Sequence, residues 1–472
     1  MKAAIVCSTA AGAACCGLAG VGAFLPTPTP VSRGMVWRNS AYRFDATGSG
    51  GGNGGGAAGA GPGGEEFGSA ALGGRGGSTG GERRGAGKRH RATTLGNLDL
   101  KPAYRLFDTV PPPSAMEAAR TSDAVDLDVM GKAPYSVDPF ALASKDLSPF
   151  TDSIKELVES DHPVLSMAAR HFFEKRHGKR FRPTIVALMA LATCDGPMQG
   201  HRESADYTRQ GQLGQITEMI HVASLIHDDV LDEADTRRGG MAVHKLYSNK
   251  VAVLAGDYLL ARASVLLARL NDHAWLFRQI KVVEIMATAL DSLVQGEIMQ
   301  LKMEPEKLLD ISMYLRKSYY KTASLITNAC KSCALLGGHD FDSDVATAAE
   351  EYGYHMGLAF QIVDDILDIV GAADVLGKPA MADMSLGLAT APILYAAETA
   401  PEIKKIIKRR FKDKGDKEKA LQAVLAGDAV ARSRELARWH AQRAVDAVLR
   451  LPPSEARDAL VNICHVVLTR NK

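Results

Sequence analysis

Two copies of one acidic motif are the feature of this 472-residue sequence with the clearest chemical potential. The first copy, DDVLD at 228–232, ends the apolar stretch 219–227. Residues four apart share one face of a helix, so Asp228 and Asp232 would present two carboxylates one turn apart. These carboxylates repel each other unless a cation lies between them. Mg²⁺ suits such hard oxygen ligands and completes its shell with water and phosphate oxygens.

The second copy, DDILD at 364–368, follows another apolar run at 358–363. A lone copy would most simply be a solvated acidic helix face. Two copies at the ends of buried helices are harder to explain in that way, because burying unpaired carboxylates costs on the order of several kcal/mol. We therefore expect metal ions to bridge the two motifs.

Basic residues recur around both motifs and suggest what the metal ions would hold. The segment GKRFRP at 178–183 places three cations beside a glycine, and Arg237 follows the first motif by five residues. Lys321 and the segment GKP at 377–379 add further cations. Each alone would most simply be a solvated basic turn. Together with Mg²⁺ they would form a clamp for a diphosphate group.

Composition excludes several other classes of function. The formal net charge is +2, from 56 basic and 54 acidic residues, so no overall field favours nucleic acid. Three of the seven cysteines lie in the first 16 residues, and the others are scattered, which does not indicate a disulfide framework. Cys330 and Cys333 form a CxxC without a second ligand pair nearby, so we interpret them as buried packing thiols.

The chain divides into three parts. Residues 1–44 lack Asp and Glu and include an apolar, small-residue run at 3–25, which predicts a targeting leader, with a permanent membrane anchor as the alternative. Residues 45–137 are rich in glycine and proline and should form a disordered linker. In 138–472, apolar residues recur every three or four positions, as in Ile216, Met219, Ile220, Ala223 and Ile226. This periodicity predicts an all-α bundle.

The ordered motifs GKRFRP, LIHDDVLDEADTRRG, YYKTASLI, FQIVDDILD and LGKP resemble the trans-isoprenyl diphosphate synthase family. The resemblance covers 138–472 and is closest to long-chain members such as solanesyl and decaprenyl diphosphate synthases, which 294–301 and the ending 467–472 also resemble. It implies the isoprenoid synthase fold, a large helical bundle around a central cavity. Members are usually homodimers, and some recruit a second subunit.

The resemblance also implies roles for individual residues. Six aspartates would bind the Mg²⁺ ions that hold the allylic diphosphate: Asp228, Asp229, Asp232, Asp364, Asp365 and Asp368. That pocket would be completed by Arg237, Lys321, Thr322, Gln361 and Lys378. Isopentenyl diphosphate would bind Lys179, Arg182, His221 and Arg238. Catalysis would depend most directly on Asp228, Asp232, Asp364, Asp365 and Lys321.

The expected reaction needs no nucleophilic side chain. Magnesium and the cationic residues would stabilise the departing diphosphate, so that the allylic carbon–oxygen bond ionises to a carbocation. The isopentenyl double bond would attack that cation, and loss of a proton would leave an allylic product one unit longer. A terpene cyclase or a non-catalytic partner subunit is a rival interpretation, but both acidic motifs and both basic segments are retained.

The length of the product should depend on the helix that carries the first motif. Ser224, Ala223 and Ile220 lie four, five and eight positions before Asp228, where short-chain members of the family place bulky aromatics. One helical turn rises about 5.4 Å, close to one isoprene unit, so small side chains admit further units. We expect roughly eight to ten units, C40–C50, for a quinone side chain. A geranylgeranyl diphosphate synthase is the alternative, because Ile220 could limit growth.

The sequence says less about where in the cell the protein acts and about what it contacts there. The leader resembles a plastid or secretory presequence, whereas 138–472 resembles mitochondrial synthases. We expect an organellar protein, with the mitochondrion favoured over the plastid. A peripheral membrane contact would help release so hydrophobic a product.

Overall fold

The computed structural model describes the following parts of the compact unit Arg91–Lys472: 132–147, 150–174, 180–237, 240–270, 276–374 and 381–470. The predicted leader, 1–44, lies outside the described residues, as does the predicted linker as far as residue 131. Three predicted ligands of the diphosphates, Lys179, Arg238 and Lys378, also lie outside them.

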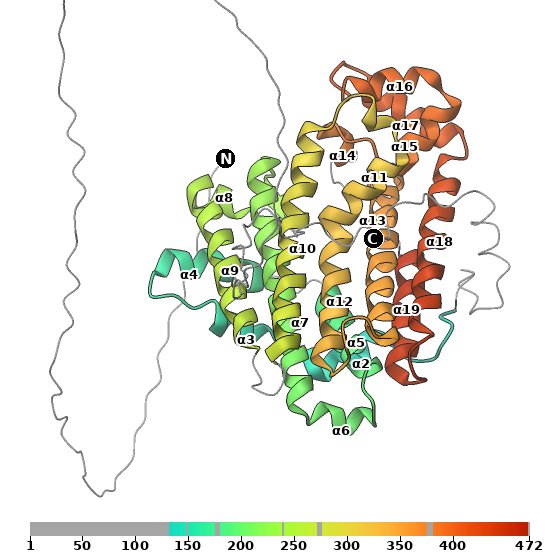
Figure 1. Ribbon diagram of the computed structural model, residues 1–472. Helices are drawn as coiled ribbons and strands as arrows, with labels where there is room; N and C mark the ends of the chain where they lie inside the picture. The colour runs from blue at the N-terminus through green and yellow to red at the C-terminus, as the bar shows by residue number, and fades with distance from the viewer. Residues whose placement is uncertain are drawn as a thin grey trace, which may run out of the picture. The chain divides into compact units, whose positions relative to one another are not determined.

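Helices make up most of the described residues, which confirms the predicted all-α fold (Figure 1). The first part of the bundle contains α2 (Pro139–Leu147), α3 (Phe150–Leu157), α4 (Pro163–Glu174), α5 (Phe181–Ala192), α6 (Met198–Arg202), α7 (Ala205–Leu231), α8 (Val243–Leu246), α9 (Asn249–Ala268) and α10 (Leu276–Lys302). Between α7 and α8, two short antiparallel strands pair, β1 (Thr236–Arg237) and β2 (Gly240–Met241).

The second part of the bundle begins with a 3₁₀ turn, η4 (Lys307–Leu309), and α11 (Ile311–Ser318). A π-helical turn, η5 (Tyr319–Ala323), joins α11 to α12 (Ser324–Leu336). The remaining helices are α13 (Asp344–Asp374), α14 (Ala382–Ser385), α15 (Ala391–Thr399), α16 (Pro401–Lys408), α17 (Asp416–Ala426), α18 (Ala429–Val448) and α19 (Glu455–Thr469).

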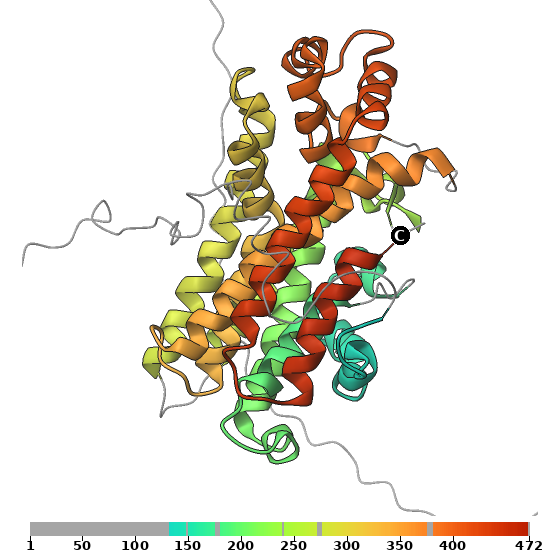
Figure 2. The same ribbon diagram turned by 90° about the vertical axis from the view of Figure 1, so that its right-hand side faces the viewer.

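The long helices pack side by side around one core. Helix α13 lies between α12 and α18, and α7 contacts α5, α9 and α12 (Figures 1 and 2). The stripe predicted on α7, from Ile216 to Ile226, is buried as expected. Cys330 and Cys333 are also fully buried, and burial raises the pKa of both thiols. Their interpretation as packing residues is therefore confirmed.

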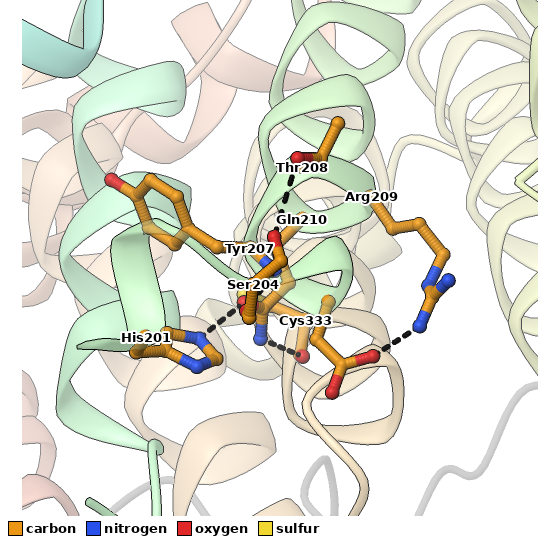
Figure 3. Close-up of polar contacts among 8 residues, drawn as sticks. His201, Ser204, Tyr207, Thr208, Arg209, Gln210 and Cys333 are labelled. Atoms are coloured by element: carbon orange, nitrogen blue, oxygen red, sulfur yellow. Dashed lines mark hydrogen bonds and ion pairs between the residues drawn. The ribbon is translucent and has the colours of Figure 1, made fainter.

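The start of α7 is fixed by side-chain hydrogen bonds (Figure 3). Ser204 is the N-cap, and its side chain accepts a hydrogen bond from the Tyr207 amide, which satisfies one of the free donors at the helix end. Gln210 donates to the carbonyl of Cys333 on α12 at 2.8 Å and lies 2.8 Å from His201. These contacts fix α7 against α12, and α7 carries the first acidic motif at its other end.

The described residues begin at 132, slightly before the domain boundary predicted at residue 138. The Tyr135 amide donates to Oδ1 of Asn462 on α19, and the Asn462 amide group donates to the carbonyls of Tyr135 and Val137. The first helix, α2, starts at Pro139, directly after Asp138, whose Oδ1 accepts from the Phe140 amide. The segment 135–137 thus packs on the bundle.

Helix α13 comes unusually close to η5, and this proximity requires glycine at position 357. A Cβ atom built on Gly357 would lie 2.5 Å from the Cα of Ala323, which is a backbone atom that cannot rotate away. The second acidic motif lies two turns further along α13, so this packing sets where that motif faces.

We predict that Gly357→Ala destabilises the protein by about 1–3 kcal/mol, because the added methyl group must displace the η5 backbone. Gly211→Ala on α7 is the matched control, since a Cβ there meets nothing within 4 Å and alanine favours helix. Urea unfolding followed by circular dichroism measures both. Equal stability of the two variants would contradict this account of the α13–η5 contact.

Candidate active site

One cavity of about 660 Å³ collects most of the predicted site residues. Its acidic lining comes from α7 and α13 and includes Asp228, Asp232, Asp364 and Asp365. The other predicted residues on its wall are Arg182, His221, Ser224, Arg237, Lys321, Thr322 and Gln361. Residues separated by more than 130 positions in the sequence therefore face one space, as the hypothesis of a shared diphosphate site requires.

The first motif divides its carboxylates between the cavity and the protein. Asp228 and Asp232 line the cavity, whereas Asp229 is buried and binds Arg237, with a 2.7 Å hydrogen bond from Nε to Oδ1. We expected all three to bind metal; in this structure Asp229 instead fixes an arginine at the cavity wall. The physical reason is rotation, since adjacent residues on a helix point about 100° apart.

The second motif shows the same division. Asp364 and Asp365 line the cavity, while Asp368 accepts hydrogen bonds from the amides of Ala382 and Asp383 at the start of α14, both at 3.2 Å. Asp368 was also an expected metal ligand, and in this structure its carboxylate caps α14 and is absent from the cavity wall. It thereby ties α14, and with it Asp383, to the motif.

Asp365 is held in a fixed orientation by hydrogen bonds. The Tyr314 hydroxyl donates to one carboxylate oxygen at 2.7 Å, and the Gln361 amide donates to the other at 2.6 Å. Thr322 donates in turn to the Gln361 carbonyl at 2.6 Å. Thr322 and Gln361, both predicted to complete the allylic pocket, thus position a carboxylate in this structure.

Lys321 faces the first motif from the π-helical turn η5. A π-helical turn inserts an extra residue into the helix, which turns Lys321 and Thr322 toward the cavity. The Lys321 ammonium lies 2.5 Å from Glu297 and donates to Gln300 at 3.1 Å. A Cβ on Gly296 would lie 2.8 Å from the Lys321 side chain, so glycine is needed where α10 passes it.

Basic and aromatic residues form the opposite wall. Arg182 lies 3.0 Å from Nε2 of His221, so two residues predicted to bind isopentenyl diphosphate lie together. Arg470 was not predicted: its guanidinium lies 4.1 Å from the Phe360 ring and 3.3 Å from Asp364, and it lines the cavity. Phe360 in turn packs against Phe181, which lies between Arg180 and Arg182 in the GKRFRP segment.

Burial and like charge raise the pKa of the carboxylates around the cavity. Burial, together with the nearby Glu297 and Asp232, raises the pKa of Asp228 to about 6, against the opposing charge of Lys321. Burial also raises the pKa of Asp232 and of Asp365. Asp383, which sequence reasoning missed, lines the cavity, and burial beside Asp365 and Asp368 raises its pKa. Such a cluster favours a bound cation, which reverses these shifts.

The carboxylates fit a divalent metal that shares its ligands with a substrate. Among the described residues, no three His, Cys, Asp or Glu side chains are close enough to enclose an ion. An ion bound here would therefore need water or phosphate oxygens in addition, which is the coordination that Mg²⁺ favours.

The residues predicted to set chain length differ in their exposure to the cavity. Ser224 lines it, whereas Ala223 and Ile220 are packed in the core at 0% and 2% exposure. Leu388 also lines the cavity. On α7 the lining extends as far as Glu218 but does not include Ala223 or Ile220, so a chain that passes those two residues requires neighbouring side chains to move.

Comparisons with known proteins agree with this geometry. The polyprenyl synthetase family model matches residues 162–424. Mitochondrial solanesyl-diphosphate synthase 1 of Oryza sativa is 42% identical over 73% of this chain and 81% of its own length. Decaprenyl-diphosphate synthase of Dictyostelium discoideum is 42% identical over 71% of this chain and 72% of its own length.

Two solved structures show the same fold. The apo Arabidopsis medium/long-chain prenyl pyrophosphate synthase is 38% identical, covers 71% of this chain and all of its own, and has a TM-score of 0.57. A Caulobacter crescentus polyprenyl synthase complexed with calcium and isoprenyl diphosphate is 31% identical over 71% of this chain and 97% of its own, with a TM-score of 0.61.

The chain belongs to the polyprenyl synthetase family, which confirms the resemblance found in its motifs. It is accordingly a prenyltransferase that uses isoprenyl diphosphates and a divalent metal.

We predict that divalent metal binding weakens below about pH 6. The pKa of Asp228 is raised from 3.8 to about 6, so this carboxyl is protonated in a range where an exposed aspartate is ionised. The metal must then displace a proton, and affinity should fall by about tenfold per pH unit. Titrating Mn²⁺ by electron paramagnetic resonance between pH 5 and 8 measures this.

Glu297→Gln provides a sharper form of this test. The substitution removes a like charge from beside Asp228, so the pH profile of Mn²⁺ binding should shift to lower pH. Asp228→Asn should make the affinity for Mn²⁺ depend less on pH. An affinity for Mn²⁺ that is constant from pH 5 to 7 in the unmodified protein would contradict the assignment of Asp228 as a metal ligand.

Proposed function

We propose that this protein is a long-chain trans-polyprenyl diphosphate synthase, which condenses isopentenyl diphosphate with an allylic diphosphate to a product of roughly eight to ten units. The observation that supports this most directly is the convergence of two acidic motifs and several cations on one cavity. The solanesyl and decaprenyl synthases among its relatives favour this product over a geranylgeranyl chain.

We infer that Mg²⁺ binds between Asp228 and Asp232 on α7 and Asp364 and Asp365 on α13. When bound, the metal would neutralise the charge that develops on the leaving diphosphate. The related Caulobacter enzyme was solved with calcium and isoprenyl diphosphate, which is consistent with a divalent ion at this place.

The remaining polar residues would hold the two diphosphates. Lys321 and Arg237 lie beside the first motif and would bind the allylic diphosphate, with Lys378 as a further proposed ligand outside the described residues. Arg182 and His221 would bind isopentenyl diphosphate, together with Lys179 and Arg238. The position of Arg470 on the same wall makes it a candidate for this second site.

The cavity residues would promote the reaction by stabilising the charge on the leaving diphosphate and by keeping water away. The allylic carbon–oxygen bond breaks with its electron pair on the diphosphate, whose charge the cationic side chains stabilise. The isopentenyl double bond then forms the new carbon–carbon bond, and a proton is lost to the released diphosphate. Phe360, Leu225 and Leu388 line the cavity and would keep water from the carbocation.

Small side chains below the first motif support a long product. Ser224 lines the cavity where an aromatic residue would fill space, and we propose that the core residues Ala223 and Ile220 and their neighbours repack as the chain grows. A chain that stopped at Ile220 would be the geranylgeranyl alternative. Mass spectrometry of the extracted product distinguishes the two.

An exposed apolar face supports the proposed homodimer. On α10, Ile280, Val294 and Ile298 are each more than half exposed and lie on one stripe of the helix. On α9, Leu254 is 60% exposed; by length and composition, α9 is also the described helix that could cross a membrane. The buried side of α9 packs on α7 and α4. We propose that a second copy of the chain covers the apolar side chains that remain exposed on α9.

We predict that Ile298→Glu with Leu254→Glu converts a dimer to a monomer, because the charges would be buried at the interface without partners. Light scattering measures the mass. The control is Leu425→Glu on α17, which is equally exposed but lies outside this face. A double variant that keeps the mass of the unmodified protein would rule out this interface.

We also propose an organellar location, with the mitochondrion favoured. The leader at 1–44 supports targeting, and the related rice enzyme is named as mitochondrial. A relative from Arabidopsis is named as both chloroplastic and mitochondrial, so the plastid remains the alternative. A fluorescent reporter fused after residue 90 tests this.

We predict that Asp228→Ala and Asp364→Ala each lower activity by about hundredfold or more, because each removes a carboxylate that faces the metal. Activity is the Mg²⁺-dependent incorporation of labelled isopentenyl diphosphate into polyprenyl product. Asp342→Ala, at an exposed aspartate that does not line the cavity, should keep full activity. Folded variants of Asp228 and Asp364 that retained full activity would overturn the proposed site.

A further inference from the structure

We propose that residues 404–419 form a docking surface for an anionic membrane beside the opening of the active-site cavity. This role presupposes the proposed function, since a product with a long hydrocarbon chain is insoluble in water and has to be received by a bilayer. The segment comprises the second half of α16, the loop after it and the start of α17.

The net positive charge of the segment 404–419 is larger than that of the whole chain. It contains nine Lys and Arg against three Asp and Glu, a formal charge of +6 in a chain whose total is +2. On α16, Ile403, Ile406 and Ile407 are buried, and the lysines lie on the opposite, exposed face. The charge is therefore presented outward on one side of a fixed helix.

Only part of this charge is neutralised within the described residues. Lys408 pairs with Glu306, and Arg409 pairs with Asp413 and Asp416. Five other lysines are exposed and form no ion pair with a described residue: Lys404, Lys405, Lys412, Lys414 and Lys419. Glu402 and Glu418 are the remaining acidic residues on these helices. A net positive surface remains for a ligand to neutralise.

The basic segment lies where the cavity opens. Helices α15, α16 and α17 gather at one end of the bundle, close to α14 (Figures 1 and 2). A shallow hollow there has Leu386, Lys412, Lys414 and Lys417 in its lining, together with Asp413 and Glu418. Leu386 also lines the active-site cavity and is 41% exposed.

Hydrogen bonds fix the segment to the catalytic wall. Lys417 donates to Ser385 on α14, whose first amides bind Asp368. Arg410 donates to the carbonyls of Gln300 and Met303 at the end of α10. The surface is therefore held at a fixed place relative to the diphosphate site.

A bilayer with anionic lipids suits this arrangement better than a small soluble anion. Lysines beside an exposed leucine, here Leu386, are typical of surfaces that bind such bilayers. Each lysine near the headgroups raises the affinity by about fivefold. A product leaving the cavity would meet the membrane at this surface.

The test uses the full chain and sedimentation with vesicles, without substrates. One set of vesicles is purely zwitterionic, and the other contains one part in three anionic phospholipid. The patch variant carries Lys404→Glu, Lys405→Glu, Lys412→Glu and Lys414→Glu. The control carries Lys132→Glu, Lys145→Glu, Arg269→Glu and Arg434→Glu, which changes the net charge equally at scattered exposed positions.

We expect the unmodified chain and the control to prefer anionic vesicles, with binding that weakens as salt is raised. The patch variant should lose that preference by about hundredfold or more. Its synthase activity in detergent should be unchanged, since none of the four residues lines the active-site cavity. This readout separates failure of the docking surface from failure of the proposed reaction.

Two results would overturn the proposal. One is equal binding of the unmodified chain to anionic and zwitterionic vesicles. The other is a patch variant that keeps the anionic preference, which would assign membrane contact to another surface, such as the exposed face of α9.

Discussion

The repulsion among carboxylates at the ends of α7 and α13 is the constraint on which the rest of this structure depends. Four of them face one partly buried cavity, where burial raises the pKa of Asp228 and Asp365 and opposes the charged forms. The surrounding helices supply the packing free energy that keeps these groups close. A divalent ion with a diphosphate would relieve this repulsion.

In each motif some acids face the cavity and another makes hydrogen bonds to the surrounding protein. Asp229 fixes Arg237, and Asp368 fixes α14, while their neighbours face the cavity. Lys321, beside the first motif, is held by Glu297. The site therefore consists of matched charges that are already in place, and a substrate needs only to exchange partners with them.

The sequence was sufficient to predict the helical fold and the two motifs, because helical periodicity and motif spacing are local properties. The grouping of Arg182 with His221 came only from the resemblance to the family, since the two residues are 39 positions apart. The sequence did not show that Asp228 faces the cavity whereas Asp229 is buried in the protein, because that depends on how α7 is rotated in the bundle. Sequence reasoning missed Asp383 and Arg470, which reach the cavity only through tertiary packing, and Glu297, which reaches Lys321 in the same way. Glu297 and Arg470 lay in segments whose resemblance had been noted, and the π-helical turn at Lys321 leaves no recognised pattern in the sequence.

The central claim is that the two motifs act together on one diphosphate. A crystal structure with Mn²⁺ and a non-reactive allylic thiolodiphosphate, located by anomalous scattering, tests it most directly. We expect manganese ions bound to carboxylates of both α7 and α13, with the diphosphate bridging them beside Lys321 and Arg237. Ions confined to one helix, or a diphosphate bound away from the pair, would contradict the account.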